Sequence, residues 1–126
     1  MNLEQIHKVY FIGIWGIGMS ALARYFVAKG FAVAGYDKTE SDITKVLTGL
    51  GVSIHFEDAI ENIDSSFLDS KTTQIIYTPA ISNTHSELLY FIANGFNVMK
   101  RSQVLGEITR QTFCLAVAGT HGKTTT

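Results

Sequence analysis

The chain has 126 residues, of which 46% are hydrophobic and 17% charged, with one proline and a net charge of -1. This composition excludes a disordered segment and a collagen-like repeat, and it provides no overall positive field for nucleic acid. The single cysteine, Cys114, excludes an intramolecular disulfide and favours a reducing compartment. The chain has no apolar run of the roughly 18 residues that cross a bilayer, and it does not begin like a signal peptide. We therefore expect a cytoplasmic protein that binds neither nucleic acid nor membranes.

Short apolar runs alternate with helical patterns along the chain. Buried strands are expected at 9–14, 31–36, 52–56, 74–78, 97–99 and 113–118, and helices at 17–29, 41–50, 84–94 and 102–110. Residues 58–63 have weak helical character. Because strands and helices alternate with short connections, the pattern predicts an α/β fold, a Rossmann-like parallel sheet flanked by helices.

A glycine-rich turn, Gly13-Ile-Trp-Gly-Ile-Gly18, lies between the first strand and the first helix. Such a turn lets the backbone approach a diphosphate, and the free N–H groups at the start of the helix then face the anion. Asp37 ends the second strand, where a carboxylate commonly accepts hydrogen bonds from a ribose hydroxyl. A purely structural turn and a solvated carboxylate are the alternatives. Trp15 occupies a position where the nucleotide-binding pattern has glycine.

A second glycine pattern, Gly119-Thr-His-Gly-Lys-Thr, follows the apolar run at 113–118. Glycines of this kind let backbone N–H groups surround phosphates, while Lys123 can reach the terminal phosphate and Thr124 can bind magnesium. The full pattern has a further glycine at position 117, where this chain has valine. The pattern predicts an ATP-binding loop.

The remaining polar candidates give weaker signals. His7, His55 and His85 are scattered without the spacing of metal ligands, and we interpret them as surface or hydrogen-bonded residues. Lys100 and Arg101 follow the fifth strand, at the edge of the sheet where ligands bind. A solvated pair is preferred there to an anion contact.

Two segments resemble the Mur ligase family of bacterial peptidoglycan synthesis: FIGIWGIGMSALA at 11–23 and AVAGTHGKTTT at 116–126. The similarity extends to 35–37, 77–81 and 100–107. The resemblance implies a parent protein with a UDP-sugar-binding domain, a central ATPase domain and a third domain that helps to bind the amino acid. This chain would contain the first domain, 1–112, and the first strand and phosphate loop of the second, 113–126.

The resemblance also implies the residues of two binding sites. The UDP-sugar would contact Gly16, Ile17, Gly18, Met19, Ser20, Asp37, Thr78, Pro79, Ala80 and Ile81. ATP would contact Gly119, Thr120, His121, Gly122, Lys123 and Thr124, and Thr124 would also bind Mg2+. No catalytic residue is expected within this chain.

In this family, ATP phosphorylates the carboxylate of UDP-N-acetylmuramate, and an amine then attacks the acyl phosphate. The sequence Gly18-Met-Ser20 favours L-alanine as the amine over the tripeptide used by a related recycling ligase. The 126 residues alone are expected to be inactive, and an unpaired strand at 113–118 is expected to promote self-association. A fragment of an NAD-dependent dehydrogenase would use the same glycine turn and Asp37, but would leave the GTHGKTTT segment unexplained. A nucleotide-sensing module without chemistry is a further alternative.

Overall fold

The computed structural model describes residues 5–14, 17–79, 81 and 84–118, with the backbone alone at 17 and 111–118. The strands are β1 (Lys8–Ile12), β2 (Ala32–Tyr36), β3 (Ser53–His55), β4 (Thr73–Tyr77) and β5 (Asn97–Lys100). The helices are α1 (Ile17–Ala28), α2 (Asp42–Gly49), α3 (Ser86–Ala93) and α4 (Arg101–Ala118), with short 3-10 helices η1 (Ile60–Asn62) and η2 (Ser65–Phe67).

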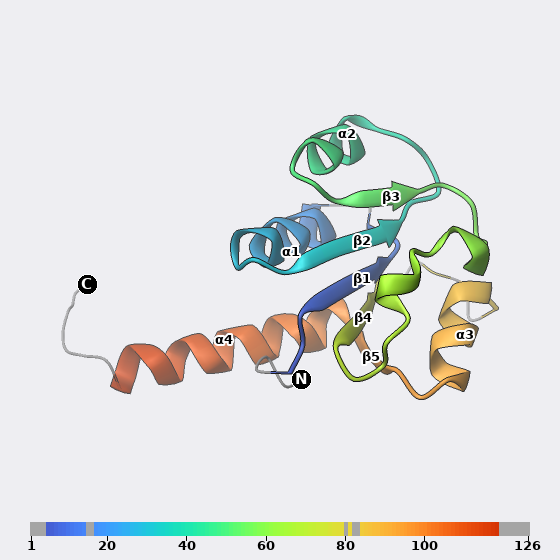
Figure 1. Cartoon of the computed structure of the whole chain (residues 1–126). Helices are drawn as coiled ribbons and strands as arrows, with labels where there is room; N and C mark the ends of the chain where they lie inside the picture. The colour runs from blue at the N-terminus through green and yellow to red at the C-terminus, as the bar shows by residue number, and fades with distance from the viewer. Residues whose placement is uncertain (1–4, 15–16, 80, 82–83, 119–126) are drawn as a thin grey trace.

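The strands form one parallel sheet in the order β3-β2-β1-β4-β5 (Figure 1). Helix α3 lies on the opposite side of this sheet from α1 and α4. The arrangement confirms the predicted Rossmann-like fold. No helix in the described part of the chain is long and apolar enough to cross a membrane.

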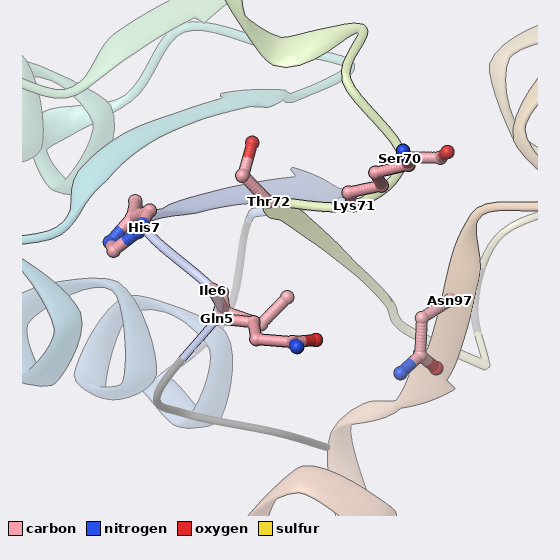
Figure 2. Close-up of a pocket in the computed structure, with 7 residues that line it drawn as sticks. All are labelled: Gln5, Ile6, His7, Ser70, Lys71, Thr72 and Asn97. Carbon is pink, nitrogen blue, oxygen red and sulfur yellow. The ribbon is translucent and has the colours of Figure 1, made fainter.

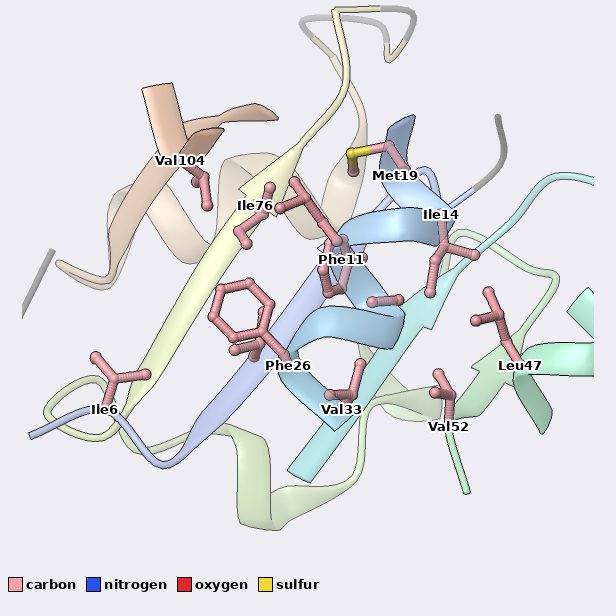
Figure 3. Close-up of a cluster of buried hydrophobic side chains, with 13 residues drawn as sticks. Ile6, Phe11, Ile14, Met19, Phe26, Val33, Leu47, Val52, Ile76 and Val104 are labelled. Atoms are coloured by element: carbon pink, nitrogen blue, oxygen red, sulfur yellow. The ribbon is translucent and has the colours of Figure 1, made fainter. Parts of the chain in front are cut away.

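The central strand β1 is apolar throughout because both of its faces are buried. Val9 and Phe11 belong to a cluster with side chains of α1, α2 and α4 (Figure 3). Tyr10 and Ile12 belong to a second cluster, which includes Phe91 of α3. A strand covered on both faces needs a continuous hydrophobic run instead of an alternating one, which is the pattern that identified this strand in the sequence.

Helix α2 begins where the sequence predicts, at the N-cap Ser41. The Ser41 side chain accepts a hydrogen bond from the Thr44 amide, and the Thr44 hydroxyl accepts one from the Ser41 amide at 2.8 Å. Such caps stabilise a helix by about 1 kcal/mol. The helix ends at Gly49, one residue before the predicted end.

The prediction of a sixth strand at 113–118 is wrong. Those residues continue α4, which runs without interruption from Arg101 to Ala118 and extends beyond the sheet (Figure 1). A six-residue apolar run fits a strand or a helix equally well by its pattern. A helix satisfies its backbone hydrogen bonds internally, whereas a strand needs a neighbour, and extending an existing helix avoids the cost of nucleation. Without this strand, the expected self-association loses its structural basis.

Candidate functional site

The carboxyl ends of β1 and β4 mark the place where the topology leaves room for a ligand. From β1 the chain moves outward to β2 and β3, whereas β4 and β5 lie on the other side of β1. Connections on the two sides of such a point diverge, and ligands of open α/β sheets bind in the resulting crevice. The glycine turn follows β1 at this point, and the segment from Thr78 follows β4.

Gly13 joins the glycine turn to its surroundings. Its φ of 87° lies in the left-handed region, and its N–H donates a hydrogen bond to the carbonyl of Tyr36 at 3.0 Å. A Cβ at this position would come within 2.5 Å of Thr78 Cγ2 and 3.2 Å of Ile81 Cγ1. Only glycine therefore allows the turn after β1 to pack against the segment after β4. The geometry brings together two of the segments that the sequence assigned to one site.

Arg101, which the sequence left as one of a solvated pair or an anion contact, lies beside the glycine turn. This first residue of α4 lies with its guanidinium against Gly18, where a Cβ would be 3.0 Å from Arg101 Cζ. Its guanidinium forms no hydrogen bond or ion pair with any residue that the structure describes. A half-buried cation beside the first turn of α1 adds its charge to the positive end of the helix dipole. The guanidinium of Arg101 and the positive end of the α1 dipole are together suited to binding a phosphate.

Asp37 follows β2 and is 2% exposed. Its Oδ1 accepts a hydrogen bond from the Thr39 amide at 3.1 Å, whereas Oδ2 is buried with no partner among the described residues. Burial raises the pKa of this carboxyl group, outweighing the backbone hydrogen bonds from Thr39 and Lys38, which lower it. A buried acceptor without a donor is costly in the free protein. It is ready to accept a hydrogen bond from a bound hydroxyl group.

Three of the expected site residues have side chains that serve the core or are otherwise buried. Met19 is 1% exposed and packs in the cluster around Phe11, while Ile81, at 9%, packs in the cluster on the α3 side. Ser20 is 8% exposed. The side chains of Met19 and Ile81 therefore belong to the core, whereas Pro79 is exposed.

Several expected site residues lie outside the described part of the chain. They are Gly16 and Ala80 of the UDP-sugar set, and all of the ATP set from Gly119 to Thr124. Trp15, where the nucleotide-binding pattern has glycine, lies outside it as well. The geometry above therefore concerns the first site alone. Among the described residues, no group of three or more histidine, cysteine, aspartate or glutamate side chains could hold a metal ion.

The histidines are less scattered than the sequence suggests. His55 Nε2 donates to the fully buried carboxylate of Glu87 at 2.7 Å, which confirms it as a hydrogen-bonded residue. His85 is 9% exposed, and its Nδ1 lies 3.2 Å from Asp58 Oδ1. Both lie on the α3 side of the sheet, next to Tyr36. The pairing of β2 with β3 places His55 beside Tyr36, which no local spacing indicates.

A separate hollow of about 560 Å³ lies at the opposite edge of the sheet (Figure 2). It is lined by residues before β1 and β4 and at the start of β5: Gln5, Ile6, His7, Ser70, Lys71, Thr72 and Asn97. Only Lys71 among these side chains carries a permanent charge. The hollow has neither the glycine turn nor the helix start that characterises the carboxyl edge, and we assign no nucleotide to it.

Comparison with known proteins gives a family match over most of the chain. Residues 8–113 match a family model described as the Mur ligase family, catalytic domain. Over 126 residues the chain is 59% identical to a UDP-N-acetylmuramate--L-alanine ligase of Flavobacterium psychrophilum, and 55% identical to one of Parabacteroides distasonis. All of this chain is covered, but only 28% and 27% of those two relatives.

Solved structures give the same result. The chain is similar to a UDP-N-acetylmuramate-alanine ligase of Thermotoga maritima, with a TM-score of 0.73 and 26% identity over 82% of this chain and 23% of that one. A UDP-N-acetylmuramate:L-alanyl-gamma-D-glutamyl-meso-diaminopimelate ligase of Neisseria meningitides matches with a TM-score of 0.70 over 81% of this chain and 31% of that one. At 19% identity, the second likeness shows the fold alone.

Proposed function

Since this chain belongs to the Mur ligase family, we propose that it is the UDP-N-acetylmuramate-binding part of a cytoplasmic, ATP-dependent ligase that adds L-alanine to that substrate. The observation that carries the proposal is the contact of Arg101 with Gly18 at the start of α1. It provides a cation that has no hydrogen-bond or ion-pair partner among the described residues, beside the first turn of α1 and at the edge of the sheet where nucleotides bind. The two relatives at 55% and 59% identity support L-alanine as the amine.

The diphosphate would bind at the turn from Gly16 to Ser20. Backbone N–H groups of the first turn of α1 are oriented toward that place, and they need no particular side chain. Arg101 would neutralise part of the diphosphate charge and can form two parallel hydrogen bonds to phosphate oxygens. Gly18 keeps the space that the guanidinium occupies.

The nucleoside would extend along the neighbouring strand ends. Asp37 would accept a hydrogen bond from a ribose hydroxyl through its unpaired Oδ2. Residues Thr78 to Ile81 would line the uracil side, since Thr78 and Ile81 pack directly on Gly13. Binding would thereby satisfy a buried acceptor that has no partner among the described residues.

The ATP-dependent step is assigned to residues that follow the described domain. Gly119 to Thr124 would bind ATP, with Lys123 on the terminal phosphate and Thr124 on Mg2+. Mg2+ and ATP together would offset the negative charge that develops on the transferred phosphoryl group. We assign 113–126 to the start of the ATPase domain on this loop pattern, although α4 runs past position 113. The 126 residues are expected to bind UDP-N-acetylmuramate but not to form amide bonds.

Calorimetric titration of the 126-residue chain with UDP-N-acetylmuramate, UDP, NADH and ATP in parallel tests this proposal. We expect the two uridine nucleotides to bind and NADH not to bind. Preferential binding of NADH would overturn the proposal in favour of a dehydrogenase-type site. ATP-dependent amide formation by this chain would contradict the expectation that these 126 residues form no amide bond.

A further inference from the structure

His55 and Glu87 form a hydrogen-bonded pair on the α3 side of the sheet, near its carboxyl edge. His55 is the last residue of β3, and Glu87 lies in the first turn of α3. The Glu87 side chain is 0% exposed, and its Oε2 lies 2.7 Å from His55 Nε2. The His55 side chain is 17% exposed. The imidazole ring is therefore held at one nitrogen by a buried carboxylate, while part of its side chain can be reached from outside.

The partners of Glu87 determine which nitrogen of His55 carries a proton. Glu87 Oε1 accepts a hydrogen bond from Tyr10 Oη at 2.6 Å, and Oε2 accepts one from the Ala59 amide at 3.3 Å. A carboxylate that accepts on both oxygens needs a donor from the histidine, so His55 Nε2 carries the hydrogen. Tyr10 Oη lies 3.0 Å from the same nitrogen and can accept a share of this hydrogen bond. In the neutral ring, Nδ1 is then an acceptor.

This acceptor is not used within the described part of the chain. No described residue forms a hydrogen bond with His55 Nδ1, and this atom is not one of the buried polar atoms that lack a partner. Glu87 and Tyr10 fix the ring from its buried side. Because the tautomer and the direction of the ring are set before a ligand arrives, Nδ1 is a preorganised acceptor at the protein surface.

The place of His55 follows the path of the proposed ligand across the sheet. Strands β3, β2 and β1 are neighbours and end at the same edge (Figure 1). The diphosphate would lie at the turn after β1 and the ribose at Asp37 after β2, and neighbouring strands are about 4.8 Å apart. The next strand end in this direction is His55, whose carbonyl accepts from the Asp37 amide at 3.1 Å. A base attached to a ribose at Asp37 can therefore reach the His55 ring.

We propose that His55 Nδ1 recognises the base of the bound nucleotide by accepting a hydrogen bond from a ring N–H group, which makes the site selective for uracil over cytosine. The inference deepens the proposed function and rests on it for the class of ligand. Uracil carries a hydrogen on N3, whereas N3 of cytosine is itself an acceptor and would face Nδ1 without a proton between them. Glu87 and Tyr10 are positioning residues, because they act through His55. Thr78 and Ile81 would line another side of the base.

Titration of the 126-residue chain with UDP and with CDP, before and after His55→Gln, tests the inference. Glutamine can place its amide N–H near the position of Nε2 and donate to Glu87, but it has no acceptor at the position of Nδ1. We expect the unsubstituted chain to bind UDP about tenfold more tightly than CDP, as one hydrogen bond gained would give. His55→Gln should raise the Kd for UDP about tenfold and remove most of this preference. His7→Gln, an exposed histidine at the opposite edge of the sheet, is the matched control and should change neither Kd.

Nitrogen NMR of the unsubstituted chain gives a second measurement, which decides the question if His55→Gln does not fold. We expect His55 to carry its proton on Nε2 and the Nδ1 resonance to shift when UDP binds. The inference is overturned if folded His55→Gln keeps the preference for UDP, if Nδ1 carries a proton in the free chain, or if its resonance does not respond to UDP. Equal binding of UDP and CDP by the unsubstituted chain would overturn this inference alone, whereas binding of neither would overturn the proposed function with it.

Discussion

The guanidinium of Arg101 packs against Gly18, so the first residue of α4 covers the first turn of α1. This contact joins two residues that follow different strands of the sheet. It explains why the glycine turn needs a small residue at this position, beyond any need to approach a phosphate. The two neighbouring basic residues therefore differ: Arg101 lies against the glycine turn, whereas Lys100 is exposed.

Gly18→Ala should weaken binding of UDP while leaving the fold intact. The new Cβ would displace the guanidinium of Arg101, a flexible group that can move at little cost, and alanine is the better helix former by up to about 1 kcal/mol. Calorimetry and thermal unfolding would separate the two effects. Gly106→Ala in α4 is the matched control, because a Cβ there meets nothing within 4 Å. Equal loss of affinity in both variants would contradict the role of the Arg101 contact.

Arg101→Gln should weaken UDP binding by about tenfold or more, as expected for loss of a charged partner of a phosphate. Uridine has no phosphate, and its affinity should change little. The difference between the two ligands should shrink in high salt, because screening weakens the charge–charge attraction. Lys100→Gln, which removes the neighbouring exposed charge, should have a small effect on both. A parallel loss of UDP and uridine binding would place Arg101 outside the diphosphate site.

Asp37→Asn should stabilise the free protein and weaken binding of the nucleotide. Because burial raises the pKa of Asp37, ionising this group costs folding free energy. The stability gained by the variant should be absent at pH values below the unfolded pKa of about 3.9, increase as pH rises through the folded pKa, and then remain constant. Urea unfolding at several pH values measures this curve. A destabilised Asp37→Asn at neutral pH would show that Oδ2 is already satisfied in the free protein.

Ionised Asp58 should stabilise the folded protein, whereas ionised Asp37 should destabilise it. Burial would raise its pKa, but hydrogen bonds from Ser86 and Glu87 and the proximity of His85 lower it below its usual value. Its stabilising contribution is therefore fully present above the unfolded pKa of about 3.9 and is lost as pH falls through the lowered folded pKa. Asp58→Asn should be less stable than the unsubstituted chain at neutral pH, and the difference should diminish in acid. A constant difference across this range would contradict an ionised Asp58 that accepts hydrogen bonds from the Ser86 and Glu87 amides.

Local sequence patterns were sufficient for the five strands of the sheet and for the position of the glycine turn. The uninterrupted apolar run of β1 indicates burial on both faces, and Ser41 marks the start of α2 through hydrogen bonds to a residue three positions away. Such signals depend on neighbours in the chain. They can therefore be recognised in the sequence without knowledge of the fold.

The tertiary structure alone decided the contacts between residues far apart in the sequence. Whether 113–118 forms a strand or extends α4 depends on the presence of a pairing partner, and its apolar pattern is compatible with both. The contact of Arg101 with Gly18, the burial of Asp37 Oδ2 and the hydrogen bonds of Asp58 with Ser86 and Glu87 all arise where different elements meet. A side chain's charge and hydrogen-bonding groups can be read from the sequence, but its partners are set by the three-dimensional packing that brings those elements together.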